Sequence, residues 1–195
     1  MTEAVLASGN QGKLTELNDL LAGTDIRLRA QSEFGVRPPA ETASTFVENA
    51  LAKARHAARI TGLPAIADDS GLEVDALAGA PGVHSARYAG PNADDTANNE
   101  RLLRELADVP AKQRTARYRA VLVYLRRSDD PAPVIAEATW EGHIAETARG
   151  TGGFGYDPLF RLADGRNVAE LAPEEKNRAS HRARAARVLA EKLRS

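Results

Sequence analysis

The sequence predicts an α/β protein built around a mixed β-sheet. Short apolar runs at residues 4–7 and 64–67 are typical of buried strands, and segments with apolar residues at helical spacing lie next to them. Two longer stretches, residues 116–125 and 134–144, have the length and composition of strands and are joined through Asp129-Asp130-Pro131. Long strands joined in this way are antiparallel neighbours, so their presence beside strand–helix units indicates a sheet with both strand directions.

Helix start and stop signals define the remaining elements. Thr45-Phe46-Val47-Glu48 is a capping box, which predicts a helix that ends at Gly62. Asp94-Asp95-Thr96 starts a further helix, and Ser180 starts the closing helix. We also expect a helix around residues 14–21, a strand at residues 26–29 and a loop at residues 31–44.

Length and composition fit a single domain over residues 1–195, or one domain divided into two lobes. The chain has 195 residues, of which 43% are hydrophobic and 27% charged, and its formal net charge is −1. No apolar run is long enough to cross a membrane, and the acidic N-terminus does not resemble a signal peptide. Because the chain has no cysteine, disulfides and thiolate chemistry are excluded, and we expect a cytoplasmic protein. The small net charge gives the protein no overall attraction for nucleic acid.

Two adjacent aspartates follow the second apolar run. Ser70-Gly71, a pair typical of turns, comes directly after Asp68 and Asp69, so we expect carboxylates exposed at the end of a strand. Carboxylates at that place can meet a ligand at the edge of an α/β sheet. Neighbouring strand residues point to opposite faces, so the two aspartates are expected to have different roles. A solvated turn with a cap explains the same residues.

A small polar loop follows the first strand and leads into a helix. Its residues are Ser8, Gly9, Asn10, Gln11 and Gly12, and Lys13 falls in the first helical turn. Free backbone N–H groups, the helix dipole and the lysine charge make such a loop attractive to phosphate. The spacing does not match a Walker A loop, and a serine–asparagine helix cap is the alternative explanation.

A second dense stretch, residues 150–158, places Phe154 and Tyr156 among glycines and ends at Asp157-Pro158. Aromatic rings on a glycine-rich loop suit stacking on a nucleobase, and a carboxylate can accept hydrogen bonds from base N–H groups. The alternative is a turn whose aromatic rings pack into the core.

Cations gather at the start of the closing helix. Lys176 precedes this helix, and His181 and Arg182 lie in its first turn, where positive charge opposes the helix dipole. A bound anion or acceptor-rich ligand would offset that cost, whereas a solvated basic face is the alternative. For Lys53 and Arg55, in the middle of the helix that starts at Phe46, a solvated face is the simpler interpretation.

Together these stretches describe a site for a nucleoside phosphate held through Mg²⁺. Magnesium takes one or two carboxylates together with substrate phosphate oxygens and waters. Glu41 and Asp69 are candidate ligands, and Asp68 is a third. A carboxylate beside the metal can also orient or deprotonate a water for attack on phosphorus.

Short motifs also occur in a fixed order along nearly the whole chain. They are Ser8-Gly9-Asn10 with Lys13, Glu41-Thr42, Thr45-Phe46, Glu48-Asn49-Ala50, Lys53-Ala54, Asp68-Asp69-Ser70-Gly71-Leu72, Gly79-Ala80-Pro81-Gly82, Ser85-Ala86-Arg87-Tyr88, the stretch from Gly152 to Pro158, Glu175-Lys176 and Ser180-His181-Arg182. Each motif is weak alone, but the ordered set is specific. It resembles the inosine triphosphate pyrophosphatase family, in particular its bacterial XTP/dITP diphosphatase branch.

The resemblance implies an elongated α/β fold with a mixed central sheet flanked by helices, two lobes with the active site between them, and a homodimer. It implies Mg²⁺-dependent cleavage of ITP, dITP and XTP to the monophosphate and pyrophosphate. Asp69 would be the catalytic carboxylate and a metal ligand, and Glu41 the second metal ligand. The implied substrate-binding residues are Ser8, Gly9, Asn10, Gln11, Gly12, Lys13, Lys53, Ser70, Phe154, Gly155, Tyr156, Asp157, Lys176, His181 and Arg182, with Phe154 stacked on the base.

One departure from the family pattern bears on magnesium affinity, because relatives often carry an acid at the position of Ala40. Preference for deaminated purines follows if His181 or Arg182 donates a hydrogen bond to a 6-oxo group, since a 6-amino group would leave that donor unpaired. Two other functions remain open. The chain could be a nucleotide- or RNA-binding module that does not hydrolyse its ligand, or a phosphatase that releases inorganic phosphate.

Overall fold

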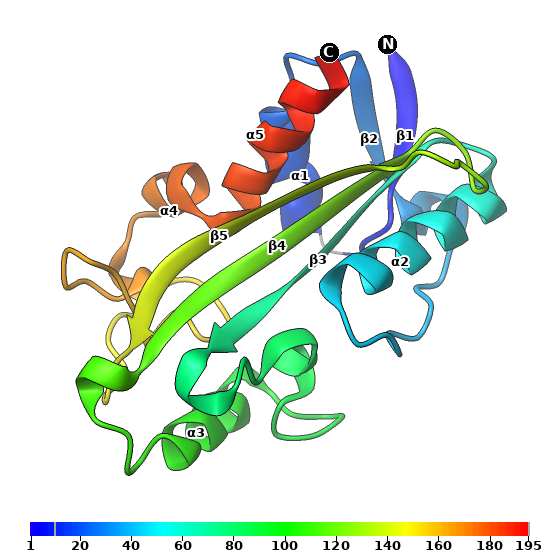
Figure 1. Ribbon diagram of the computed structural model, residues 1–195. Helices are drawn as coiled ribbons and strands as arrows, with labels where there is room; N and C mark the ends of the chain where they lie inside the picture. The colour runs from blue at the N-terminus through cyan, green and yellow to red at the C-terminus, as the bar shows by residue number, and fades with distance from the viewer. Residues whose placement is uncertain (10, 195) are drawn as a thin grey trace. The chain divides into compact units, whose positions relative to one another are not determined.

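The computed structural model describes residues 1–9 and 11–194, and in this part of the chain one six-stranded sheet has the order β2-β1-β3-β4-β5-β6 (Figure 1). The strands are β1 (Thr2–Leu6), β2 (Ile26–Ala30), β3 (Ala65–Val74), β4 (Thr115–Leu125), β5 (Val134–Ile144) and β6 (Phe160–Arg161). The helices are α1 (Gln11–Leu20), α2 (Phe46–Thr61), α3 (Asp95–Glu105), α4 (Pro173–Ala179) and α5 (His181–Arg194). Strand β1 pairs in parallel with β2 and β3, whereas β5 and β6 are antiparallel. The predicted mixed α/β fold is confirmed.

The chain divides into two compact units. Unit 1 comprises residues 1–70, 120–138 and 181–195, and unit 2 comprises residues 71–119 and 139–180. Strands β3, β4 and β5 each contribute residues to both units. The single domain over residues 1–195 stays a prediction. Within the described residues, every helix is too short or too polar to span a membrane.

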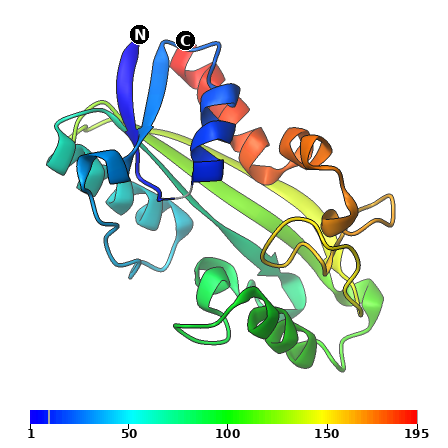
Figure 2. The same cartoon turned by 180° about the vertical axis from the view of Figure 1, so that it is seen from behind.

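The core of unit 1 lies between the sheet and helices α1 and α5, which contact each other (Figure 2). Leu17 of α1 and Leu189 of α5 are fully buried, as are Leu6 of β1 and Ile66 of β3. Within each helix the buried residues recur at helical spacing, Leu14 and Leu17 in α1 and Ala185, Ala186 and Leu189 in α5, so each helix presents one apolar side to the strands. The predicted strand at residues 26–29 and the helix around residues 14–21 are confirmed, with small shifts of their ends.

Helix α2 begins and ends where the sequence indicates. The hydroxyl of Thr45 accepts a hydrogen bond from the Glu48 N–H group, and Gly62 adopts the left-handed conformation with φ of 71°. A residue with a Cβ is disfavoured at that φ, so the glycine marks the end of the helix. Asp94 caps α3 in the same way, by accepting a hydrogen bond from the Ala97 N–H group.

The core of unit 2 is aromatic. The rings of Tyr118 and Phe160 lie 4.4 Å apart between centroids, and Trp140 packs at 6.3 Å from Phe160. Gly142 permits this packing, because a Cβ at its position would lie 2.6 Å from the Phe160 ring and from the Arg161 carbonyl oxygen. The close approach of β5 to β6 therefore requires a glycine here.

Two local expectations are wrong. The turn expected at Ser70-Gly71 is instead the middle of β3, which runs on to Val74. Leu72 and Val74 are fully buried in the core of unit 2, and burial of these side chains overrides the local turn preference of Ser-Gly. The loop expected at residues 31–44 also begins with a short 3₁₀ helix at Gln31–Phe34, because the Glu33 carboxylate accepts a hydrogen bond from the Ala30 N–H group.

The short connection between β4 and β5 is organised by Asp130, which is 2% exposed. Its carboxylate accepts hydrogen bonds from the backbone N–H groups of Arg126 and Ala132, both at 3.0 Å. The Arg126 guanidinium also donates to it, at 2.8 Å. The hydrogen bonds from the Arg126 side chain, and then those from the backbone, hold the pKa of Asp130 well below its usual range.

Replacing Asp130 by alanine should lower the free energy of unfolding by about 1–2 kcal/mol at pH 7, since two backbone N–H groups lose their acceptor. The half-exposed Arg126 side chain adds little to this loss, because water screens its charge. A carboxylate with a lowered folded pKa stabilises above the unfolded value near 4, and that stability is lost as pH falls through the folded pKa. Urea unfolding should therefore separate Asp130→Ala from wild type less at pH 2.5 than at pH 7. The exposed neighbour Asp129, replaced by alanine, is the control, and an equal effect of both variants would contradict the assignment.

Candidate active site

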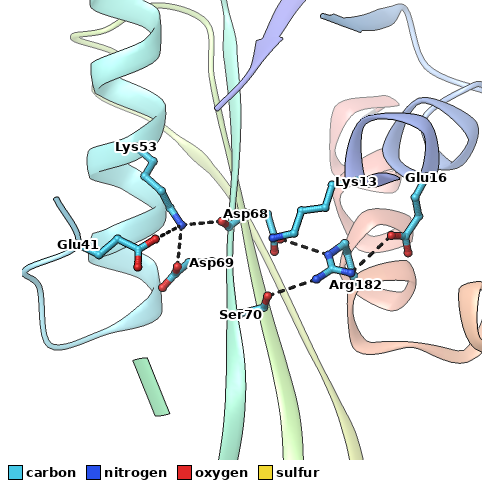
Figure 3. Close-up of polar contacts among 8 residues, drawn as sticks. All are labelled: Lys13, Glu16, Glu41, Lys53, Asp68, Asp69, Ser70 and Arg182. Atoms are coloured by element: carbon cyan, nitrogen blue, oxygen red, sulfur yellow. Dashed lines mark hydrogen bonds and ion pairs between the residues drawn. The ribbon is translucent and has the colours of Figure 1, made fainter. Parts of the chain in front are cut away.

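Strand β3 carries two adjacent buried aspartates whose side chains point to opposite faces (Figure 3). Asp68 faces helices α1 and α5, and Asp69 faces α2 and the segment that precedes it. This is the alternation of a strand, and the prediction that the two side chains point to opposite faces is confirmed, whereas their different roles stay a prediction. The exposure expected for both carboxylates is wrong, because the strand continues past them and both are buried. All of the residues drawn in Figure 3 belong to unit 1.

The Asp68 carboxylate is 3% exposed and lies among cations. Its Oδ2 atom accepts a hydrogen bond from Lys13 Nζ and one of 3.2 Å from Arg182 Nε. Arg182 is itself buried and contacts Glu16 Oε2 through Nη1 at 3.5 Å. Burial raises the pKa of Asp68, but the charges of Lys13 and Arg182 outweigh burial and hold that pKa well below its usual range. Asp68 is therefore a permanent anion that orients two cations.

On the other face, the Lys53 ammonium group binds three oxygen atoms. It donates to Asp69 Oδ1 at 2.7 Å, to the Asp68 carbonyl oxygen at 2.8 Å and to Glu41 Oε1 at 3.0 Å. An ammonium group has three donors, so this arrangement uses all of them. Lys53 is 8% exposed, which shows that the solvated face expected for this lysine is wrong, whereas Arg55 is exposed as expected.

Burial and charge act on this trio in opposite directions. Burial lowers the pKa of Lys53, but the Asp69 and Glu41 carboxylates outweigh burial and raise it, so Lys53 stays protonated. Burial raises the pKa of Asp69, and repulsion from Glu41 and Asp68 adds to the increase, against the opposing effect of Lys53. A carboxylate with a raised pKa is a better proton acceptor at neutral pH than an ordinary aspartate.

The same trio bears on magnesium binding. Glu41 and Asp69 come from different parts of the chain and place one oxygen each on the same cationic group. Two carboxylates that converge on a cation match the donor set that magnesium takes when substrate phosphate and waters complete its shell. Within the described residues no cluster of three acidic or histidine side chains forms an all-protein metal cage. The donor set therefore fits a metal shared with a ligand.

The polar loop after β1 leads into α1 as expected. Ser8 is half-buried, Gly9, Gln11 and Gly12 are exposed, and Lys13 lies in the first turn of α1. Asn10, predicted to bind phosphate, lies outside the described residues.

The glycine-rich stretch belongs to unit 2, and its two aromatic residues differ. Phe154 is 59% exposed, and Lys176 Nζ lies 4.2 Å from the centroid of its ring. Tyr156 is buried in the core of unit 2, where its hydroxyl donates to the Ser85 carbonyl oxygen at 2.8 Å. The expectation that aromatic rings tuck into the core thus holds for Tyr156 and is wrong for Phe154.

Asp157 holds this stretch in shape. Its carboxylate accepts hydrogen bonds from the Phe154 N–H group at 2.9 Å, from the Tyr118 hydroxyl at 3.1 Å and from Lys176. Gly153 lies so near that a Cβ there would be 2.0 Å from Asp157 Oδ2. Asp157 therefore fixes the loop that carries Phe154 and links it to Lys176 of α4.

His181 and Arg182 lie in the first turn of α5, as predicted, and both are buried. The interpretation of this helix as a solvated basic face is correct for the exposed residues Arg184, Arg187, Lys192 and Arg194. It is wrong for Arg182, which is buried.

Sequence reasoning missed Glu16 and Tyr118, which contact Arg182 and Asp157 respectively. The available signal for Glu16 was its spacing of three residues from Lys13, which places both on one helix face. Tyr118 carried no signal beyond its position on a strand, because its partner comes from residue 157.

Asp68→Asn should lower the free energy of unfolding by about 3 kcal/mol, since it leaves the buried cation Arg182 and the half-buried cation Lys13 beside a neutral amide. Asp19→Asn, an exposed change on the same helix as Lys13, is the matched control and should shift the urea midpoint little. Equal midpoints for the two variants would show that Asp68 is not the counter-ion on which these cations depend.

Comparison with known proteins agrees with this geometry. Residues 4–192 match the Ham1 family. The chain is 60% identical over 190 residues to the dITP/XTP pyrophosphatase of Thioalkalivibrio sulfidiphilus, with 97% of each chain covered, and 54% identical to that of Pectobacterium atrosepticum, with 100% of each covered. It also superposes on a HAM1 protein from Coxiella burnetii with a TM-score of 0.95 and 49% identity, covering 100% of this chain and 99% of that one. The chain therefore belongs to the Ham1 family.

Proposed function

We propose that this protein hydrolyses deaminated purine nucleoside triphosphates, namely ITP, dITP and XTP, to the monophosphate and pyrophosphate. The observation that carries the proposal is the convergence of Glu41 and Asp69 on one buried cationic group. On the opposite face of the same strand, Asp68 binds Lys13, the lysine that ends the predicted phosphate loop. Full-length relatives named dITP/XTP pyrophosphatase support this choice of substrate.

In the proposed reaction a water oxygen attacks the innermost, α-phosphorus of the triphosphate. The bond from that phosphorus to the bridging oxygen of the β-phosphate breaks, and pyrophosphate leaves. Asp69 is proposed to accept the proton of the attacking water, a role to which its raised pKa is suited. Lys53, which stays protonated, would keep Asp69 in place and offset negative charge that develops on the phosphate oxygens.

Glu41 and Asp69 are the residues we propose to hold Mg²⁺. Asp68 is the weaker third candidate, because Lys13 and Arg182 already occupy its carboxylate. When bound, the ion would neutralise phosphate charge and help to align the triphosphate with the water. We propose that the phosphate oxygens are held by Lys13 and the residues before it, Ser8, Gly9, Asn10, Gln11 and Gly12. Ser70, which directly follows the two aspartates, is a further proposed substrate-binding residue.

We propose that Phe154 stacks on the purine, and that Gly155 and Asp157 of the same loop and Lys176 of α4 contact the nucleoside. Exposure of the Phe154 ring supports this, since a buried ring could not stack on a ligand. For Tyr156, burial and its bond to Ser85 favour support of the loop over direct contact. His181 and Arg182 remain the proposed donors to the 6-oxo group that distinguishes these purines from adenine.

The remaining expectations stay proposals: a homodimer, a cytoplasmic location and no nucleic-acid partner. A panel of triphosphates with and without Mg²⁺, scored for pyrophosphate and for inorganic phosphate, tests the function. Pyrophosphate release from ITP and XTP, with little from ATP, is the expected result. Release of inorganic phosphate would instead support a phosphatase, and binding without turnover would support a nucleotide-binding module.

Asp69→Asn should lower kcat for ITP by roughly 100-fold or more, because the amide cannot accept the proton from water. Circular dichroism checks that the variant is folded, and Asp108→Asn, at an exposed position, is the control with unchanged turnover. Turnover of Asp69→Asn near that of the control would remove Asp69 from its proposed role.

Phe154→Ala should raise KM for ITP about tenfold, with a smaller effect on kcat, because a base–aromatic stack contributes about 1–3 kcal/mol. Ile60→Ala removes a large apolar side chain that is comparably exposed, at 52%, and serves as the control for loss of exposed apolar area. If both variants change KM equally, stacking on Phe154 is not the cause.

A further inference from the structure

Unit 2 has a cavity that shares no residue with the predicted active site. Its volume is about 380 Å³. Lys112, His143, Arg149 and Arg161 line it, together with the single acid Glu146. Three permanent cations thus face one carboxylate in a protein whose formal net charge is −1. His143 had no role in the sequence analysis, and here it lies among these cations.

None of these four basic side chains forms a hydrogen bond or ion pair with another residue that the structure describes. Elsewhere in the same unit arginines are neutralised: Arg117 by Asp75 and Glu141, and Arg166 by Asp164 and Glu175. All four basic side chains are exposed, so water screens their mutual repulsion. No other described residue neutralises them, and an anion in the cavity can contact several of them at once.

The backbone around the cavity is fixed. His143 and Arg161 are directly opposite each other in the β5–β6 pair, so their side chains leave the same face of the sheet. The Ala145 N–H group donates to the Leu159 carbonyl oxygen at 2.8 Å, and the Arg149 N–H group donates to that of Pro158 at 2.9 Å. Buried Ile144 and Ala145 form part of the lining. The cationic groups therefore stand on a rigid base, which reduces the ordering that binding requires.

We propose that this cavity is a second anion site, which binds a small polyphosphate anion of the size of pyrophosphate. Guanidinium groups match phosphate oxygens in pairs, and the cavity supplies two of them with an ammonium group beside them. The volume is at the lower end of small-molecule sites, which suits a compact anion. Three cations against the single carboxylate Glu146 leave an excess of positive charge, which attracts a multiply charged anion more strongly than one of single charge.

The site is tested by titrating inorganic pyrophosphate into the full chain without divalent metal, while NMR follows the arginine Nε–H signals. Single variants assign the Arg149 and Arg161 signals. Both should shift in a saturable way, and inorganic phosphate should bind more weakly. In Arg149→Gln/Arg161→Gln, calorimetry should show one class of pyrophosphate site weakened at least tenfold.

Arg55→Gln/Arg104→Gln is the matched control, since it makes the same change in net charge. It removes two exposed arginines whose side chains likewise form no hydrogen bond or ion pair with the described residues. It should change the affinity less than twofold. Equal losses in the two double variants would show attraction by net charge alone and overturn the site.

A short single-stranded RNA is the second ligand to test. If Arg149 and Arg161 were needed to bind this RNA but not to bind pyrophosphate, the ligand of the cavity would be a nucleic acid, and the proposal would be overturned. Because no cavity residue belongs to the proposed active site, hydrolysis of ITP stays measurable in these variants and tests the proposed function separately.

Discussion

One buried ammonium group organises the candidate active site. Lys53 Nζ joins helix α2 to strand β3 and to the segment that carries Glu41, by binding a carbonyl oxygen and two carboxylates. A buried charge is tolerated only where such partners replace water, so the position of Lys53 fixes where both acids can lie. The chemistry proposed for Asp69 depends on that constraint.

Asp68, which precedes Asp69 in β3, binds different partners on the opposite face of the strand. Asp68 is committed to Lys13 and Arg182, and Glu16 supports Arg182 from α1. Because adjacent residues of a strand face opposite sides, the two carboxylates keep separate partners, which a flexible turn could not ensure. Asp68 binds Lys13 and Arg182, and Asp69 shares Lys53 with Glu41. Continuity of β3 through Ser70 and Gly71 is what makes this division possible.

Much of the fold could be predicted because its signals are local. The caps at Thr45 and Asp94 and the leucine spacing of α1 are short-range properties of the chain. The failures have the opposite origin. Ser70-Gly71 has the composition of a turn, and Lys53 that of a solvated helix face; each is overridden by partners distant in sequence. The pairing of Glu16 with Arg182 and the different exposure of Phe154 and Tyr156 likewise depend on tertiary packing.

Oxygen-18 labelling of the solvent reveals which phosphorus the water attacks. ITP is hydrolysed in water enriched in oxygen-18, and both products are analysed by mass spectrometry. If the side chains around Asp69 direct water to the innermost phosphorus, one heavy oxygen appears in the inosine monophosphate and none in the pyrophosphate. Label in pyrophosphate, with unlabelled monophosphate, would place the attack on the β-phosphorus and rule out the role proposed for Asp69.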